Sequence, residues 1–384
     1  MRFLHTADWH IGKKLNGYEL LTDQRAVIEQ LITMVEEQQL DALVIAGDVY
    51  DRSVPSVEAV ALLNDVLETV NLVKNIPIFA VSGNHDSAVR LHTGAPWFKQ
   101  TTFHLVTDLA EALKPISFKG TQCYLLPYFE PIAARLYFQD DTIQTIAQAV
   151  ERVVAEMKTT FDPTQKHLLI SHFFVAGSLR SESETPIEVG GLASVPRELF
   201  ADFDYTALGH LHSPQALKTG TVRYSGAPLC YSLSEAEEVK GAWLVDTETG
   251  EQTFLEVTPL RPVRIKKAAF TELIDPAVYQ TLPRDAFWHF ELTDRAVIPN
   301  MMNQLRQIYP HLLSVERLTG QVVKPLQRKR VTKQLAPETL IADFFHEQTG
   351  GKLTASQKEW LDKGLSYALD TEKRDNYATE KAND

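Results

Sequence analysis

The chain has 384 residues, of which 44% are hydrophobic, so it can bury a substantial core and form two or three domains. Its formal net charge of −12 argues against nonspecific binding of nucleic acid by the whole protein surface, because such binding comes mainly from Lys and Arg side chains that neutralise phosphates. The first residues resemble neither a signal peptide nor a membrane span, so we expect a cytoplasmic protein without membrane contact. Cys123 and Cys230 form no CxxC pair, so we expect neither a disulfide nor a zinc–thiolate site.

Apolar strands alternate with amphipathic helices from residue 1 to about residue 258, which is typical of a layered α/β domain. Apolar residues at helical spacing predict helices around residues 27–35, 57–70 and 142–158. The strands that precede polar motifs are expected at residues 3–7, 42–46, 78–81, 168–170 and 206–208. Ligand sites in open α/β sheets lie at the carboxyl ends of strands, so these motifs are the candidate functional residues.

The pattern changes after residue 258. Residues 259–323 predict a smaller α/β capping domain, with a strand at 287–292 and a helix near 300–308. A basic linker is expected at 324–335 and a helical segment at 336–370, whereas the polar residues 371–384 predict a disordered tail.

Basic residues cluster twice in this second half. The first cluster is Arg261, Arg264, Lys266 and Lys267, and the second is Lys324, Arg328, Lys329, Arg330 and Lys333. Either cluster can be a DNA contact or merely a solvated connector, which is what charge runs usually are.

Five short motifs follow the five strands. They are Asp8-Trp9-His10, Gly47-Asp48-Val49-Tyr50-Asp51-Arg52, Gly83-Asn84-His85-Asp86, Ser171-His172 and Gly209-His210-Leu211-His212. A single histidine near a strand is usually structural, and we give the histidines outside these motifs, such as His5, that role. The five motifs together predict that His, Asp and Asn side chains converge on two hard divalent ions.

The ordered set DxH, GDxxDR, GNHD, H and GHxH resembles the calcineurin-like metallophosphoesterase superfamily over residues 1–245. Together with Tyr224-Ser225-Gly226-Ala227-Pro228 and Ser234-Glu235-Ala236, it resembles the SbcD family of nuclease subunits from bacterial DNA-repair complexes. The resemblance implies a layered metallophosphoesterase sandwich of two sheets flanked by helices, with a small α/β capping domain and a C-terminal helical tail.

The same resemblance implies a role for each motif residue. One metal would be held by Asp8, His10 and His212, the other by Asn84, His172 and His210, and Asp48 would bridge them. The ions would be two Mn²⁺, although Mg²⁺ or another divalent ion suits the same ligand types.

His85 would act in catalysis, by protonating the leaving oxygen or stabilising the transition state, with Asp51 orienting it. Two alternatives stay open from the residues alone. Asp51 can instead pair with Arg52 as a turn carboxylate, and Asp86 can take the orienting part.

The function implied is a manganese-dependent DNA nuclease, acting as a duplex-end exonuclease and a hairpin or single-strand endonuclease in DNA repair and recombination. Its implied partners are DNA, a second copy of the chain, and an SbcC-type coiled-coil ATPase that binds the helices of 336–370, forming a heterotetramer. The chain lacks a Walker-type loop, so ATP dependence would come from that partner. The alternatives are that these helices fold back on their own domain, that the substrate is a small phosphodiester or a phosphoprotein, or that the chain is a noncatalytic scaffold.

Overall fold

The computed structural model describes residues 1–98, 100–178, 194–217, 220–318, 337–349 and 351–380. It forms two compact units. The first comprises Met1–Ile265, Pro283–His289 and Tyr309–Ser314, and the second comprises the remaining described residues. Among the described residues, no helix combines the length and the apolar character that crossing a membrane requires.

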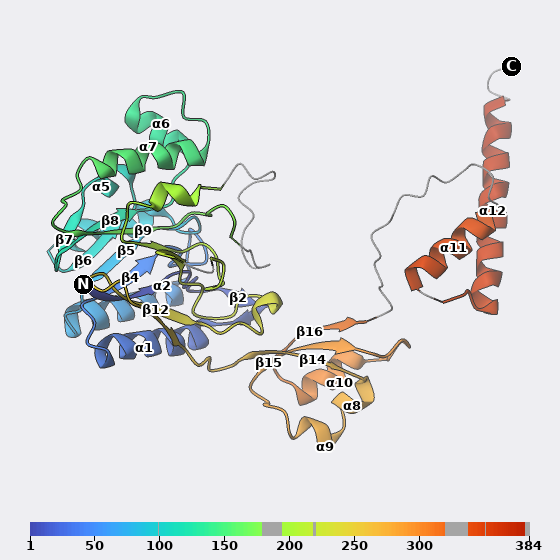
Figure 1. Cartoon of the computed structure of the whole chain (residues 1–384). Coiled ribbons are helices and arrows are strands. Elements are labelled where there is room, and N and C mark those ends of the chain that lie inside the picture. Colours follow the sequence, from blue (N-terminus) through green and yellow to red (C-terminus); the bar gives the residue numbers. More distant parts are fainter. Residues whose placement is uncertain (99, 179–193, 218–219, 319–336, 350, 381–384) are drawn as a thin grey trace. The chain divides into compact units, whose positions relative to one another are not determined.

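The first unit contains two large sheets (Figure 1). One has the strand order β13 (Gln252–Glu256), β12 (Gly241–Asp246), β1 (Arg2–Thr6), β4 (Ala42–Ala46), β5 (Ile78–Val81) and β6 (Phe103–Val106). The other has the order β11 (Val222–Tyr224), β10 (Tyr205–Leu208), β9 (Lys166–Ser171), β8 (Thr121–Leu126) and β7 (Ile116–Phe118). Strands β1, β4, β5 and β6 are parallel, as are β8 to β11.

Alternation along the strands builds two cores. Phe3 and Val44 pack in the core that includes the second sheet, whereas their neighbours Leu4 and Leu43 pack in the core on the other face of the first sheet. The latter face is covered by α1 (Leu21–Glu37) and α2 (Val57–Leu67), and α7 (Ile146–Lys158) packs in the core of the second sheet. The first unit is therefore the two-sheet sandwich flanked by helices that the resemblance implied.

Two predicted helices differ at their ends from the structure. The helix expected at 57–70 begins where the Ser56 hydroxyl accepts from the Ala59 amide, but after Leu67 it continues as a π-helical segment, η1 (Glu68–Val73). The helix expected at 142–158 begins only at Ile146, because Thr145 and Gln148 form a capping box there.

Short elements complete the first unit. They are β2 (Lys14–Leu15), β3 (Tyr18–Glu19), α3 (Ala88–Leu91), η2 (His92–Gly94), α4 (Ala95–Phe98), α5 (Leu109–Ala112), α6 (Pro131–Phe138), η3 (Arg197–Phe200) and η4 (Leu233–Glu235).

A three-stranded sheet follows, in the order β14 (Val263–Ala268), β15 (Phe287–Leu292) and β16 (Leu312–Arg317). The helices of this part of the chain are α8 (Phe270–Leu273), α9 (Pro276–Tyr279), α10 (Met301–Ile308), α11 (Pro337–Thr349) and α12 (Ala355–Glu380). The strand predicted at 287–292 and the helix near 300–308 are both present. Helix α12 extends beyond residue 370 into the segment predicted to be disordered, which has Glu, Lys, Arg and Ala and neither Gly nor Pro. The predicted linker 324–335 lies outside the described residues, and the predicted domain boundaries stay predictions.

Candidate metal centre

All five motifs lie at the carboxyl ends of strands that are neighbours in the two sheets. Strands β1, β4 and β5 of the first sheet lead to Asp8, Asp48 and Asn84, and strands β9 and β10 of the second lead to His172 and His210. Because β4 packs against both β9 and β10, the loops of the two sheets meet above this edge. The topology therefore brings together side chains that lie up to about two hundred residues apart, as in the His10–His212 pair.

The main chain of these loops is strained. Asp8, His10, Asp48 and His210 have positive φ angles of 53°, 43°, 49° and 99°. Residues other than glycine rarely adopt such angles, and when they do the surrounding structure holds them there. Here the Asp8 amide donates to the Gly47 carbonyl at 3.0 Å, and the His10 amide donates to the Asp48 carbonyl at 3.0 Å. The first two loops thus fix each other in this conformation.

The motif glycines are needed because the loops approach so closely. Gly47 has a φ of +89°, and a Cβ atom at Gly83 would overlap the side chain and amide of Asp48. A Cβ atom at Gly209 would overlap the Ala46 carbonyl oxygen and the His172 ring. Any larger residue at these positions would push the candidate ligands apart.

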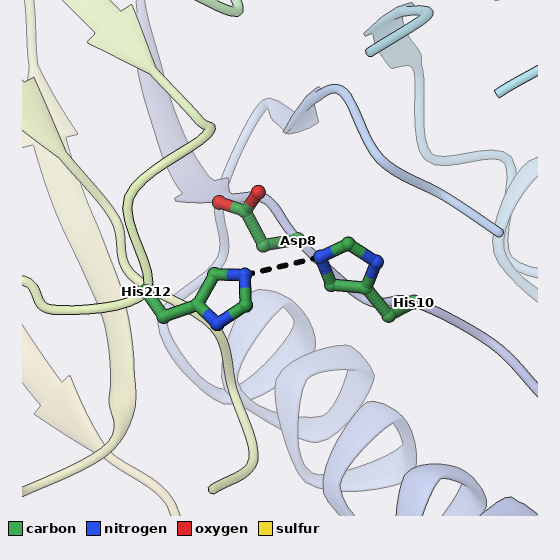
Figure 2. Close-up of side chains that lie close together, drawn as sticks. All are labelled: Asp8, His10 and His212. Atoms are coloured by element: carbon green, nitrogen blue, oxygen red, sulfur yellow. Dashed lines mark hydrogen bonds between the residues drawn. The ribbon is translucent and has the colours of Figure 1, made fainter. Parts of the chain in front are cut away.

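Asp8, His10 and His212 form one cluster, shown in Figure 2. The Nε2 atoms of His10 and His212 lie 3.1 Å apart, and Asp8 lies beside both rings. The Asp8 carboxylate also accepts from the His210 amide at 3.0 Å. All three side chains are buried. This is the first ligand set that the resemblance implied, brought together from both sheets.

Asn84, His172 and His210 converge in the same way. The Oδ1 atom of Asn84 lies 3.0 Å from Nε2 of His172 and 3.0 Å from Nδ1 of His210. The other nitrogen of His172, Nδ1, donates to the Ala46 carbonyl oxygen at 2.7 Å, which fixes the ring orientation. The structure therefore also assembles the second predicted set.

Asp48 lies between the two sets. Its Oδ2 atom is 3.2 Å from Nε2 of His172 and 3.7 Å from Nε2 of His10. Its Oδ1 atom accepts from the His85 amide at 2.9 Å. One carboxylate thus reaches a member of each set while it anchors the loop that carries His85, which is the arrangement a bridging ligand requires.

Burial and charge set the electrostatics of the cluster. Burial raises the pKa of Asp8 to about 7, although His172 and His212 lower it in part. Burial also opposes ionisation of Asp48, but His172 and His10 outweigh it and hold the pKa of Asp48 well below its usual range. Burial opposes protonation of His172 as well, yet the two carboxylates outweigh it and raise the pKa to about 9. A proton on His172 thus balances the Asp48 charge, and a divalent cation is suited to the same role.

The donor set fits such a cation. It contains imidazole nitrogens and carboxylate and amide oxygens, with no thiolate, and the ligand atoms of Asp8, His10 and His212 lie within 4.8 Å of one another. Two imidazole nitrogens that face each other at 3.1 Å can share only one proton, so a cation satisfies both lone pairs better than a hydrogen bond does. The residues present are therefore those of a divalent-metal site.

His85 lies beside this cluster, and its ring packs edge-on to that of His10 with the centroids 4.8 Å apart. Its Nδ1 atom lies 2.9 Å from the main-chain carbonyl oxygen of Asp51, to which it donates. The Asp51 carboxylate accepts from Lys13 Nζ at 2.7 Å and lies 3.5 Å from Nε of Arg52. The His85 ring is thus held by the Asp51 main chain, whereas the Asp51 carboxylate pairs with Lys13 and lies within 4.8 Å of ring nitrogens of His10 and His85.

The Asp86 carboxylate links two loops through hydrogen bonds to their main-chain amides. The carboxylate accepts from the amides of Val49, Tyr50 and Gly83, at 3.1, 2.9 and 2.9 Å. It thus ties the loop after β4 to the loop after β5. These contacts give Asp86 a structural part rather than that of orienting His85.

Three further residues support the site and were not predicted. Gln24, on α1, donates to the His10 carbonyl at 2.7 Å and accepts from the Gly12 amide at 3.0 Å, so it shapes the first loop from within the core. Glu235 and Lys240 form a buried pair behind His212. Their only signal in the sequence was the Ser234-Glu235-Ala236 motif, to which no role was attached.

The first basic cluster is partly used in internal ion pairs. Arg261 donates from Nε to Asp23 at 2.9 Å, and Lys266 lies 3.2 Å from the Glu272 carboxylate. Arg264 and Lys267 are exposed. The second cluster, Lys324 to Lys333, lies outside the described residues.

Comparison with known proteins agrees with this geometry. The calcineurin-like phosphoesterase family matches residues 1–214, and the family described as the type 5 capsule protein repressor C-terminal domain matches residues 259–349. The chain is 35% identical over 375 residues to the SbcD subunit of the SbcCD nuclease of Staphylococcus epidermidis, covering 97% of this chain and 100% of the relative. The chain belongs to the SbcD family of calcineurin-like phosphoesterases.

A second SbcD relative, from Staphylococcus saprophyticus, is 34% identical over 373 residues, which is 96% of this chain and 99% of the relative. Among solved structures, the protein TT1561 of Thermus thermophilus is 13% identical and covers 67% of this chain and 99% of its own. The TM-score is 0.42, so the structural similarity is weak. The SbcD family and the clusters described above make the centre a divalent-metal site of the phosphoesterase type.

Proposed function

We propose that this chain is a metal-dependent nuclease that hydrolyses phosphodiester bonds in DNA, as the nuclease subunit of a complex with an SbcC-type ATPase. The observation that carries the proposal is the convergence of seven buried or half-buried metal-type ligands from both sheets, with His85 beside them. Relatives that match the chain over nearly its whole length and are named as nuclease subunits support it.

The contacts support the ligand roles that we propose. Asp8, His10 and His212 would hold one ion, and Asn84, His172 and His210 the other. Asp48 would bridge them, because Oδ2 is the atom that reaches both sets. The nitrogen and oxygen ligands suit Mn²⁺, which we propose as the ion, with Mg²⁺ as the alternative that metal exchange would detect.

Bound as a pair, such ions activate water at neutral pH and offset the charge of a phosphate in an in-line displacement. Within the chain, His85 is the group suited to the leaving oxygen. Its Nδ1 atom is hydrogen-bonded to the Asp51 carbonyl oxygen, so Nε2 is the nitrogen that would deliver a proton to the leaving oxygen. Its amide is held by Asp48, so the position of its main chain depends on the proposed bridging ligand.

The function is tested with the purified chain and two substrates, an end-labelled DNA hairpin and a chromogenic phosphodiester, each with Mn²⁺ and with chelator. Manganese-dependent hairpin cleavage that is lost in His85→Ala is the expected result. Turnover of the small diester without DNA cleavage would instead favour a small phosphodiester as the substrate. Binding of neither Mn²⁺ nor Mg²⁺ would favour the noncatalytic scaffold.

We further propose that α11 and α12 bind the ATPase partner. Phe344 on α11 is 59% exposed and Trp360 on α12 is 77% exposed, although both are large apolar side chains. A chain that ends before residue 337 should keep manganese-dependent diester hydrolysis and lose binding to a co-expressed ATPase. Binding by the shortened chain would place the interface elsewhere.

A second copy of the chain is the other proposed partner. Of the apolar residues predicted on the helix at 57–70, Leu63, Val66 and Val70 are buried, whereas Val57 is 81% exposed. On the adjacent short helices, Val89 and Trp97 are 82% and 72% exposed. Sedimentation should show a dimer that Val57→Glu weakens, and a monomeric wild-type chain would contradict this proposal.

A further inference from the structure

Behind His212, on the side away from His10, lies a buried carboxylate. Glu235 is 1% exposed and ends the short helix η4. Its Oε1 atom lies 3.6 Å from Nδ1 of His212 and accepts from the Ser232 hydroxyl at 3.0 Å. The opposite ring nitrogen, Nε2, faces His10 at 3.1 Å (Figure 2). The imidazole of His212 therefore stands between the metal cluster and a carboxylate.

Lys240 holds this arrangement together. Its ammonium group is buried and donates to Oε2 of Glu235 at 2.6 Å, to Glu238 at 2.9 Å and to the main-chain carbonyl of His212 at 3.0 Å. An ammonium group has three donors, and all three are used here. Lys240 thus fixes both the carboxylate and the backbone of the histidine that the carboxylate faces.

The other side of the His212 backbone is fixed by the Gly226 turn. The Ala227 amide donates to the His212 carbonyl at 3.0 Å, and a Cβ atom at Gly226 would lie 2.7 Å from that carbonyl oxygen. The His212 main chain is therefore held from two directions, and the Nδ1 atom of its ring faces Glu235.

We propose that Glu235 is a positioning residue for His212: it accepts the Nδ1 proton and so presents the Nε2 lone pair to the metal. This inference rests on the proposed metal-dependent function. A histidine ligand binds a cation through one neutral nitrogen, and a carboxylate on the other nitrogen selects that tautomer and strengthens the ligand. Lys240 keeps Glu235 from swinging away, and Glu235 in turn balances the buried charge of Lys240.

The test compares Glu235→Gln with Glu238→Gln in the full chain, with Mn²⁺ binding measured by titration calorimetry. Each variant removes one carboxylate from Lys240, but only the first removes the group that faces Nδ1 of His212. We expect Glu235→Gln to weaken one of the two binding events about 10- to 100-fold, as loss of such a supporting group does elsewhere. Glu238→Gln should change neither event by more than about twofold. Equal effects, or none in Glu235→Gln, would overturn the proposal.

A double variant, Glu235→Gln with Lys240→Met, separates positioning from charge balance because it leaves no buried ammonium without a partner. Binding that is weaker in the double variant than in Lys240→Met alone supports positioning, and binding restored to the wild-type affinity overturns it. Nitrogen NMR of the histidines in the metal-free chain should show Nδ1 of His212 protonated in the wild type and lose that preference in Glu235→Gln. If the wild-type chain binds no metal, the proposed function fails instead, so the two failures are distinguishable.

Discussion

The Nδ1 atom of His85 donates to the main-chain carbonyl oxygen of Asp51 at 2.9 Å. A main-chain acceptor cannot be lost by substitution of its side chain. The orientation of His85 therefore depends on the fold of the loop after β4, which Asp86 braces through the amides of Val49 and Tyr50.

Replacing His85 with Ala should lower DNA cleavage by about 10²- to 10⁴-fold, the usual contribution of a positioned acid or base. Mn²⁺ binding should be nearly unchanged, because His85 belongs to neither proposed ligand set. Single-turnover cleavage and calorimetric titration of the same preparation check both parts. Loss of one metal together with activity would show that His85 is a ligand.

Asp51→Asn should be far milder than His85→Ala, with cleavage reduced less than about tenfold, because the carbonyl that binds His85 remains. The variant loses the ion pair with Lys13, and Lys13→Met, which breaks the same pair from the other side, is its matched control. The test is the rate of DNA cleavage by Asp51→Asn, Lys13→Met and His85→Ala, measured at saturating Mn²⁺. If Asp51→Asn were as inactive as His85→Ala with metal retained, the carboxylate would be the orienting group after all.

Asp48→Asn should impair binding of both ions, because one oxygen of Asp48 reaches a ligand from each set. We expect the stoichiometry to fall from two Mn²⁺ per chain to one or none. His210→Asn, which removes a ligand of one set only, serves as the comparison. A variant at Asp48 that still bound two ions with wild-type affinity would rule out the bridging role.

Metal removal should lower thermal stability, since binding to the folded chain alone stabilises it by about 2.7 kcal/mol when the free metal is at 100 times its dissociation constant. Scanning calorimetry with Mn²⁺ and with chelator measures the shift in Tm. Asp48→Asn should show a smaller shift, and an equal shift in that variant would mean that the ions bind elsewhere.

His5 should make stability depend on pH. It is fully buried between the sheets, with Nε2 donating to the Leu208 carbonyl and Nδ1 accepting from the Tyr205 hydroxyl. Burial lowers its pKa from 6.5 to about 3. Between these values the unfolded chain binds the extra proton, so stability is full above pH 6.5 and falls as the pH is lowered.

The expected slope from His5 is about 1.4 kcal/mol per pH unit below pH 6. Urea unfolding in chelator at pH 5, 6 and 7.5 measures it as the difference between the wild type and His5→Gln. The variant should be less stable at pH 7.5, and the gap should narrow toward pH 5. A gap that is constant with pH would mean that His5 has the same pKa in the folded and the unfolded chain.

Much of this centre was predictable because its signals are local. A glycine and a polar residue after an apolar strand indicate a ligand at a sheet edge, and this rule located Asp48, Asn84 and His210 correctly at strand ends. The alternation of strand and helix predicted a layered α/β domain, and the family resemblance implied that its layers form a two-sheet sandwich.

The contacts that sequence could not provide join loops that are distant in the chain. The sequence around Asp86 and Asp51 does not show which of the two carboxylates accepts from main-chain amides. The sequence around Glu235 does not show that it lies behind His212. Such contacts depend on where loops from two sheets meet. The length of α12 was missed for another reason, because a polar segment rich in helix formers can be either helical or disordered.

Four of the proposed ligands, Asp8, His10, Asp48 and His210, lie in left-handed backbone conformations, each of which costs about 1–3 kcal/mol. Glycine would relax the main chain at any of them and remove a ligand. Selection for a more stable fold and selection for metal binding therefore oppose each other at the same four positions. A descendant of this chain that no longer needed the metal would gain stability by losing these residues first, so their presence together is a mark of continued selection for the centre.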